Sequence, residues 1–216
     1  MLTADPIQLP VSDAIVLAPG LAIQGIRRRY ERNAEIFGEG EPAEHLYRVV
    51  SGVARTIWFS SDGRRQILGF HFPGDVFGIE TAPRHAVAAE AVTSCQVALV
   101  RRSMIEQAAA RDAQAAQGLL RLVTAHLQRS QAHVLLLGRK GAGERVAAFL
   151  LEMADRVRGE IDLPMSRADI ADYLALTIET VSRAFSQMER DHAIDLPTSR
   201  HVVVRDRHAL ECLQAA

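Results

Sequence analysis

Residues 166–183 decide the fold of this chain, and they read SRADIADYLALTIETVSR. Ser166 is a typical helix N-cap, and Asp169 stands three positions later, where its side chain can return the hydrogen bond as in a capping box. The apolar residues that follow share one helical face: Ile170, Ala171 and Leu174. The segment therefore predicts a short helix that begins at Ser166 and buries one face.

A second helix is predicted after the tight turn Ala175-Leu176, with Thr177 as its N-cap. Its apolar face comprises Val181, Ala184, Phe185 and Met188. Its opposite face is polar, with spacings of three and four: Glu179, Ser182, Arg183, Ser186 and Arg190. A short helix, a tight turn and a helix with a polar face together form a helix-turn-helix.

The residue types on the polar face suit the edges of DNA bases. The Arg183 guanidinium can donate to both O6 and N7 of guanine, and the Glu179 carboxylate can accept from N4 of cytosine. Because a carboxylate is repelled by phosphate, a glutamate in this position favours reading of base sequence over non-specific binding. A solvated helix face with a Glu179–Arg183 ion pair would use the same residues, but the capped first helix and the turn favour DNA.

The residues after Arg190 predict a two-stranded wing. Two short segments, 194–196 (IDL) and 201–204 (HVVV), flank the turn Pro197-Thr198-Ser199-Arg200. Arg200 and His201 would lie at the tip of this wing, near DNA phosphate.

Residues 26–102 have a different texture, with short apolar stretches between turn signals. The predicted strands are Tyr47–Val50, Val53–Phe59, Gln66–Phe72 and Gln96–Val100, and the turns between them include Ser61-Asp62-Gly63 and Pro73-Gly74-Asp75. Short strands at this spacing indicate a small β-sandwich or barrel.

A long helix is predicted from Ser103 to Leu137, which contains no proline and one glycine. A mostly apolar series of positions alternates spacings of four and three, as in the a/d seam of a coiled coil: Ala116, Leu120, Val123, Leu127, Ser130, Val134 and Leu137. Such a seam suits either packing on the chain's own β-domain or a two-fold contact, and its narrowness favours a homodimer interface at Leu120, Val123, Leu127 and Val134.

These patterns divide the chain into four parts. We expect a β-domain with a flanking helix at 1–102, a dimerisation helix at 103–137, a glycine-rich hinge at 138–143 and a DNA-binding domain at 144–216.

The motifs resemble those of the cyclic-AMP receptor protein/FNR superfamily of bacterial regulators. The helix-turn-helix carries the resemblance, and the run from Glu179 to Arg183 with an apolar residue before it is similar to the FNR and FixK branch. Three further segments resemble the β-roll markers of the family: 37–40, 51–54 and 73–78. The resemblance implies an α+β fold with an antiparallel β-roll (a double-stranded β-helix of the cyclic-nucleotide-binding kind), a long dimerisation helix and a winged helix-turn-helix.

The resemblance also implies roles for individual residues and a partner. Base-reading positions are Ile178, Glu179, Ser182 and Arg183, and phosphate-contacting positions are Ser166, Arg167, Thr177 and Thr180, with Arg200 from the wing. The implied target is double-stranded DNA bearing an inverted TTGAT-like repeat, bound by a homodimer in adjacent major grooves. We expect a transcription regulator, mainly an activator, that also contacts RNA polymerase in the cytoplasm.

The effector signatures of the family are incomplete in this sequence. Segment 78–86 splits the Gly-Glu pair that cyclic-nucleotide binders use for ribose, and Arg84-His85 lacks the hydroxyl partner for phosphate. Iron–sulfur sensors carry an N-terminal cysteine cluster, whereas the first cysteine here is Cys95. We therefore expect no cofactor, no cyclic nucleotide and no metal, with control by protein amount or by oxidation at Cys212 or Cys95.

Three alternatives remain open at this level. His45, His71 and His85 permit a sensor of haem-bound gas or of another small ligand. The same histidines permit a cupin-type metalloenzyme, although the His-x-His pair of such sites is missing. An adaptor that has lost DNA binding is disfavoured by the intact Glu179, Ser182 and Arg183.

Composition narrows the kind of DNA binding that is expected. The 216 residues carry 25 basic and 26 acidic side chains, and the part after Leu137 has 11 basic and 13 acidic residues. Met1–Gln24 lacks a basic start followed by an apolar run, so neither a signal peptide nor a membrane span is expected. A DNA-binding domain without a basic excess predicts weak non-specific binding and a large share of affinity from positioned contacts.

Overall fold

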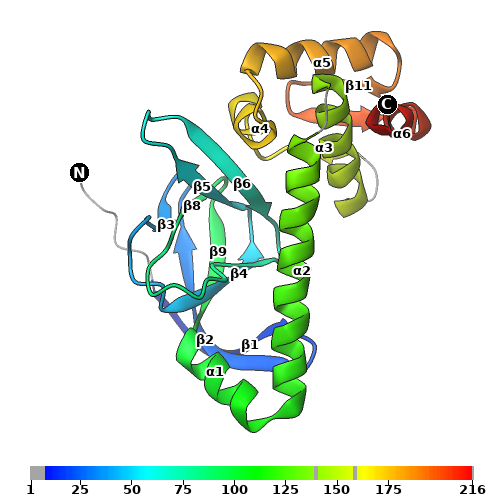
Figure 1. Cartoon of the computed structure of the whole chain (residues 1–216). Coiled ribbons are helices and arrows are strands. Elements are labelled where there is room, and N and C mark those ends of the chain that lie inside the picture. Colours follow the sequence, from blue (N-terminus) through cyan, green and yellow to red (C-terminus); the bar gives the residue numbers. More distant parts are fainter. Residues whose placement is uncertain (1–7, 139–140, 158–159, 216) are drawn as a thin grey trace. The chain divides into compact units, whose positions relative to one another are not determined.

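A computed structural model describes residues 8–138, 141–157 and 160–215, which form two compact units, 1–130 and 131–216. The first unit contains two antiparallel sheets (Figure 1). The larger sheet has the order β1 (Gln8–Ala18), β2 (Leu21–Tyr30), β9 (Cys95–Arg101), β4 (His45–Ser51), β7 (Val76–Phe77). The smaller sheet has the order β3 (Glu35–Phe37), β8 (Ala88–Ala91), β5 (Ala54–Phe59), β6 (Arg65–His71).

The central strand β9 is buried on both faces, which explains its continuous apolar run from Val97 to Val100. Val97 and Leu99 belong to a core that also contains Phe37, Tyr47 and Phe77 from other strands. Ala98 and Val100 belong to a second core, to which the helices contribute Ile105, Ala115 and Leu122.

Glycines permit the tight connections between these strands. Gly52 follows β4 with φ +75°, and a Cβ at this position would lie 2.4 Å from the Ser94 carbonyl oxygen. The predicted turns at 61–63 and 73–75 are confirmed, with Gly63 and Gly74 at positive φ.

The helical segment differs from the prediction of one helix from Ser103 to Leu137. The structure has α1 (Arg102–Arg111) and α2 (Ala113–Leu137), separated at Asp112. The Asp112 carboxylate accepts the Gln114 N–H at 2.9 Å, so the side chain starts a new helix where the backbone turns. The helix expected within 1–102 is α1 instead, because the described residues before Arg102 contain no helix.

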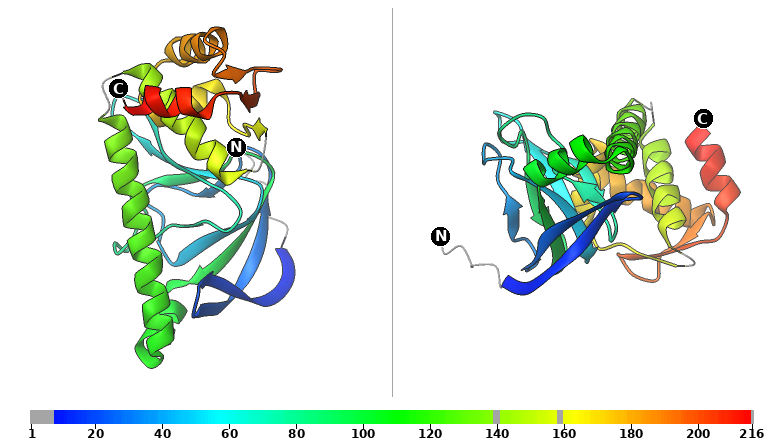
Figure 2. Two further views of the ribbon diagram at one scale, coloured as in Figure 1. Left: turned by 90° about the vertical axis from the view of Figure 1, so that its right-hand side faces the viewer. Right: turned by 90° about the horizontal axis from the view of Figure 1, so that it is seen from below.

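The long helix α2 runs beside the strands of the first unit and its last residues belong to the second unit (Figure 2). Leu122 and Leu136 are buried, whereas the predicted seam residues Leu120, Val123, Leu127 and Val134 are exposed. Leu120 and Val134 keep 67% and 68% of their surface accessible. Leu120 and Val134 therefore lie outside the core of this chain, whereas Val123 and Leu127 line a cavity that Leu46 and Ile79 also line.

The second unit is a small helical domain with a short sheet. It contains α3 (Ala142–Arg156), α4 (Arg167–Leu174), α5 (Ile178–Arg190) and α6 (Arg207–Ala215), and an antiparallel sheet in the order β10 (Ile161–Asp162), β12 (His201–Val204), β11 (Ile194–Asp195). The apolar residues predicted on the first helix of the helix-turn-helix are buried in α4: Ile170, Ala171 and Leu174. Helix α3 also buries one face: Val146, Phe149, Leu150 and Met153. The predicted hinge at 138–143 includes residues 139–140, which lie outside the described residues, so it stays a prediction.

Candidate nucleic-acid interface

The capping box predicted at the start of α4 is present. The Ser166 hydroxyl oxygen accepts the Asp169 N–H at 3.1 Å, and the Asp169 carboxylate accepts the Ser166 N–H at 3.0 Å. The Ser166 hydroxyl also donates to the same carboxylate at 2.8 Å. This arrangement holds the first turn of α4, and it commits the Ser166 hydroxyl proton to Asp169, leaving the predicted phosphate contact of Ser166 a prediction.

The turn between α4 and α5 is held by a left-handed residue and by an arginine from α3. Ala175 has φ 51° and ψ 49°, and the Leu176 N–H donates to the Ala171 carbonyl at 3.0 Å. The Arg145 guanidinium donates through Nη1 to the carbonyls of Leu174 at 3.0 Å and Ala175 at 3.3 Å. A cation at these terminal carbonyls also opposes the negative end of the helix dipole.

Arg145 was missed by the sequence reasoning. It is separated from Leu174 by 29 positions, and an arginine beside the apolar face of α3 has no sequence signature that distinguishes it from a solvated side chain. Only the packing of α3 against the helix-turn-helix shows that Arg145 supports the turn.

We expect Arg145→Ala to lower the free energy of unfolding by about 1–2 kcal/mol, because two carbonyls at the turn lose a charged donor. Arg156→Ala on the same helix is the matched control, since the contact of Arg156 with Glu152, at 3.5 Å, is a solvent-accessible ion pair, and its loss should cost less than about 0.5 kcal/mol. Urea denaturation followed by circular dichroism measures both. Equal effects of the two substitutions would contradict the role given to Arg145.

Helix α5 begins as predicted, with the Thr177 hydroxyl oxygen accepting the Thr180 N–H at 3.2 Å. Glu179 lies in the first turn, and its pKa is lowered by hydrogen bonding from its own backbone N–H, then by the Thr177 hydroxyl and the charge of Arg183. Glu179 therefore remains a carboxylate, and can act as an acceptor for a base amino group. The Thr177 and Thr180 hydroxyls lie 3.0 Å apart, within the cap.

The two faces of α5 separate as the spacing predicts. Val181, Phe185 and Met188 are buried, whereas Ile178, Glu179, Ser182 and Arg183 are exposed. The structure thus brings the predicted base-reading residues together on one exposed face of a helix whose N-terminus is fixed by a cap and a supported turn.

Arg167 lies differently from a side chain that reaches out to phosphate. Its guanidinium carbon is 3.3 Å from the centroid of the Phe185 ring, and burial lowers the pKa of Arg167 to about 10. Its Nη1 is buried without a hydrogen-bond partner in the described part of the chain. In this structure Arg167 therefore joins α4 to α5 by a cation–π contact, and a phosphate contact stays a prediction.

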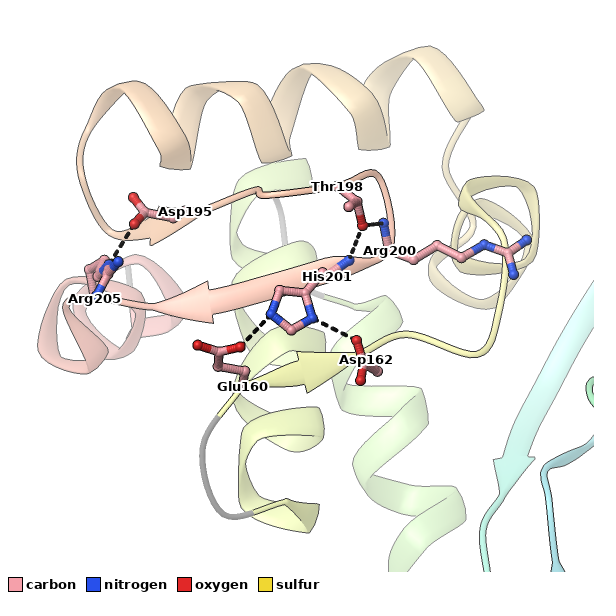
Figure 3. Close-up of polar contacts among 7 residues, drawn as sticks. All are labelled: Glu160, Asp162, Asp195, Thr198, Arg200, His201 and Arg205. Atoms are coloured by element: carbon pink, nitrogen blue, oxygen red, sulfur yellow. Dashed lines mark hydrogen bonds and ion pairs between the residues drawn. The ribbon is translucent and has the colours of Figure 1, made fainter.

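The wing contains a third strand that the sequence reasoning missed. Strand β10 pairs with β12, placing Asp162 directly opposite His201. Arg200 is exposed at the end of the 197–200 turn, and its backbone N–H donates to the Thr198 hydroxyl oxygen at 3.3 Å. His201 was expected near phosphate, but its ring lies between the carboxylates of Glu160 and Asp162 (Figure 3).

Segment 78–86, which stands where cyclic-nucleotide binders hold their ligand, makes contacts within the protein. The Glu80 carboxylate accepts from Nδ1 of His85 at 2.7 Å and from the Ala86 N–H at 2.8 Å. The buried His85 ring stacks on Phe37 with centroids 3.7 Å apart, and Arg84 donates to the Gly40 carbonyl at 2.6 Å. Among the described residues, no group of three or more metal-ligating side chains is arranged to hold an ion.

The two cysteines have different environments. Cys95 is buried in the core between the sheets, and burial raises its pKa to about 11, which opposes the thiolate form that reacts with oxidants. Cys212 is exposed on α6, with Sγ 3.6 Å from Nε2 of His208. Of the two candidate redox sites, only Cys212 is accessible.

None of the described helices is both long enough and apolar enough to cross a membrane.

Comparisons with known proteins cover both units of the chain. The Crp-like helix-turn-helix domain matches residues 144–213, and the cyclic nucleotide-binding domain matches residues 27–112. The nitrogen fixation regulation protein FixK of Azorhizobium caulinodans is 48% identical over 202 residues, which cover 90% of this chain and 82% of that protein. FixK of Rhizobium meliloti is 40% identical over 187 residues, 85% of each chain.

A solved structure shows the same architecture. FixK2 from Bradyrhizobium japonicum superimposes with a TM-score of 0.85 and 50% sequence identity, covering 89% of this chain and 98% of that one. The comparisons confirm the predicted α+β fold of β-roll, long helix and helix-turn-helix, and they place the chain among transcription regulators rather than enzymes, which removes the cupin alternative. The chain therefore belongs to the cyclic-AMP receptor protein/FNR family, as a FixK-like DNA-binding transcriptional activator.

Proposed function

We propose that this activator binds an inverted TTGAT-like operator as a homodimer, and that it needs neither a cyclic nucleotide nor an iron–sulfur cluster to do so. The observation that carries the proposal is the exposed α5 face with Glu179, Ser182 and Arg183. Arg183 supplies a bidentate donor for the guanine of such a site, and Ile178 and Ser182 lie beside it to meet neighbouring base edges.

The exposed seam of α2 supports the homodimer. Leu120, Val123, Leu127 and Val134 are exposed apolar side chains at a/d spacing, and a contiguous apolar stripe of this kind marks an interaction surface. A second copy supplies the matching stripe by two-fold symmetry, which also presents two recognition helices to the two halves of a palindrome.

The packing of the β-roll supports independence from cyclic nucleotides. The aromatic rings of Phe37, Tyr47 and Phe77 fill the space between the sheets together with His85, and Glu80 already binds the His85 ring. A ribose hydroxyl bound at Glu80 would have to compete with the hydrogen bond between Glu80 and the buried His85 ring.

Added cyclic AMP is therefore expected to change the operator affinity by less than about twofold, since a ligand without differential binding shifts no equilibrium. Fluorescence anisotropy with a labelled operator measures the affinity with and without cyclic AMP at about 1 mM, a concentration well above a micromolar dissociation constant. A tenfold or larger increase in affinity, at about 1.4 kcal/mol of coupling, would overturn the effector-independent part of the proposal.

Selection of bound DNA from a random pool, without added ligand, tests the whole proposal. We expect enrichment of an inverted repeat with half-site centres about one helical turn apart. Enrichment of unrelated sequences would contradict the TTGAT-like target, and a single half-site would contradict the dimer.

Recruitment of RNA polymerase in the cytoplasm is the output that we propose for the bound dimer.

A second candidate function, control by a small ligand, is favoured by one cavity. It has a volume of about 650 Å³ in the first unit, and its apolar lining comes from the sheet, α1 and α2: Leu46, Ile79, Ile105, Leu119, Val123 and Leu127. Charged side chains also line it, at Glu80, Arg102 and Glu106, so the cavity suits a largely apolar molecule that carries a polar group. If DNA selection succeeds only after the low-molecular-weight fraction of a cell extract is added, control by a small ligand replaces the ligand-free proposal.

Control by oxidation has a separate test. Loss of DNA binding on peroxide treatment would point to Cys212.

A further inference from the structure

His201 forms a bridge between two strands of the wing, through both nitrogens of its ring (Figure 3). Nδ1 lies 2.6 Å from Oδ1 of Asp162, and Nε2 lies 2.5 Å from Oε2 of Glu160. Asp162 is the direct cross-strand partner of His201, and Glu160 immediately precedes β10. We call these three residues the wing clasp.

The geometry of the wing clasp is that of a protonated imidazole. A neutral ring has one N–H and one lone pair, so it can donate to only one carboxylate, while the other carboxylate would face the lone pair. A protonated ring donates to both. Hydrogen bonds to Asp162, then to Glu160, raise the pKa of His201 above its ordinary value.

Both carboxylates of the wing clasp remain open to solvent. The side chains of Asp162 and Glu160 are 88% and 61% exposed. The other charged groups of the described wing are engaged elsewhere or point away: Arg205 binds Asp195 at 2.6 Å, and the Arg200 side chain extends away from the ring (Figure 3). His201 is therefore the group that offsets the two carboxylates, and the wing clasp carries a net charge of −1 with the ring protonated and −2 with the ring neutral.

We propose that His201 is a positioning residue of the wing whose protonation makes operator affinity depend on pH. The protonated ring ties β10 to β12 next to the turn that bears Arg200, and it halves the negative charge that the clasp directs at DNA phosphate. Deprotonation releases one carboxylate and leaves two uncompensated negative charges on the wing. This inference rests on the proposed DNA-binding function, and its sign is fixed: affinity falls as pH rises through the pKa of His201.

The test uses the full-length protein and its selected operator between pH 5.5 and 8.5 at constant ionic strength (about the range over which histidine changes charge). We expect the dissociation constant of the wild-type protein to rise about two- to fivefold over this range, because one added negative charge acts on nearby phosphates in a screened medium. Glu160→Gln combined with Asp162→Asn should move the midpoint of that rise to lower pH, because the His201 ring loses the acceptors that raise its pKa, and should bind at high pH at least as tightly as the wild type at low pH, because both carboxylates are gone.

His201→Asn should flatten the profile and hold it at the weaker affinity, because the two carboxylates then have no titrating partner. His192→Asn is the matched control, because His192 is exposed on the same unit and has φ 58°, a conformation that asparagine accepts. It should retain the wild-type profile. A double amide variant that keeps the wild-type profile would overturn the proposal, as would a control that flattens it.

A titration of the His201 ring by NMR without DNA separates this inference from the proposed function. A raised pKa in the wild type that falls in the double amide variant supports the clasp even where no operator is bound. An unshifted ring in the wild type overturns the clasp even where the operator binds well.

Discussion

Replacing Arg183 by alanine is expected to lower the preference for the operator over scrambled DNA by about 5- to 150-fold, which corresponds to about 1–3 kcal/mol. The loss should appear in the operator affinity and much less in the affinity for scrambled DNA. Parallel gel-shift titrations with the two DNA duplexes measure the ratio directly.

The physical reason lies in how α5 presents Arg183. The guanidinium is exposed on a helix whose opposite face is locked by Val181, Phe185 and Met188, and the N-terminus of that helix is fixed by the Thr177 cap. A planar fork held in this way can donate two parallel hydrogen bonds to guanine, which a methyl group cannot replace. Glu179 adds a negative charge on the same face, so that little of the affinity comes from general attraction to phosphate.

Arg190→Ala provides the matched control for charge. Arg190 is exposed on the last turn of the same helix, where it donates to the Gln187 side chain at 2.5 Å. Arg190→Ala removes one positive charge from α5, as Arg183→Ala does, and should weaken binding to both duplexes to a similar extent. A specificity ratio that falls equally in both variants would show that Arg183 contributes charge and does not read a base.

The parts of this site that depend on neighbouring residues could be predicted from the sequence. The Ser166–Asp169 box, the Thr177 cap and the two faces of α5 follow from spacings of three and four, because each contact is made within one or two turns. Asp112 belongs to the same class: its capping chemistry was present in the sequence, but the high helix propensity on both sides of it concealed the break between α1 and α2.

The parts that depend on distant residues could not be predicted in the same way. Arg145 reaches carbonyls 29 and 30 positions away, and His201 meets carboxylates 39 and 41 positions away. Strand β10 has only two residues, too few for an alternating pattern to be recognised. Arg167 shows the same limit, since its residue type fits a phosphate contact while Phe185 determines where its guanidinium lies.

Leu120→Asp is the second large effect that we expect, and it tests the dimer. Leu120 is 67% exposed in the single chain, so the substitution should change the free energy of unfolding of the monomer by less than about 0.5 kcal/mol. In a two-fold dimer it acts twice, because each copy loses an apolar contact worth about 1.5–3 kcal/mol and the two carboxylates approach each other across the axis. We expect a monomer in sedimentation equilibrium and an operator affinity lower by about 100-fold or more, since the second half-site no longer binds intramolecularly.

Leu135→Asp is the control that distinguishes an interface at the a/d positions from association through any exposed apolar side chain. Leu135 is 71% exposed on the same helix, more than Leu120, but it lies outside the a/d spacing that links Leu127 and Val134. If exposed apolar surface alone drove association, the two substitutions would have equal effects. If the a/d stripe is the interface, Leu135→Asp leaves the dimer and its operator affinity intact. A dimer that survives Leu120→Asp would place the two-fold contact elsewhere, and the narrow seam on α2 would then need another partner to cover it.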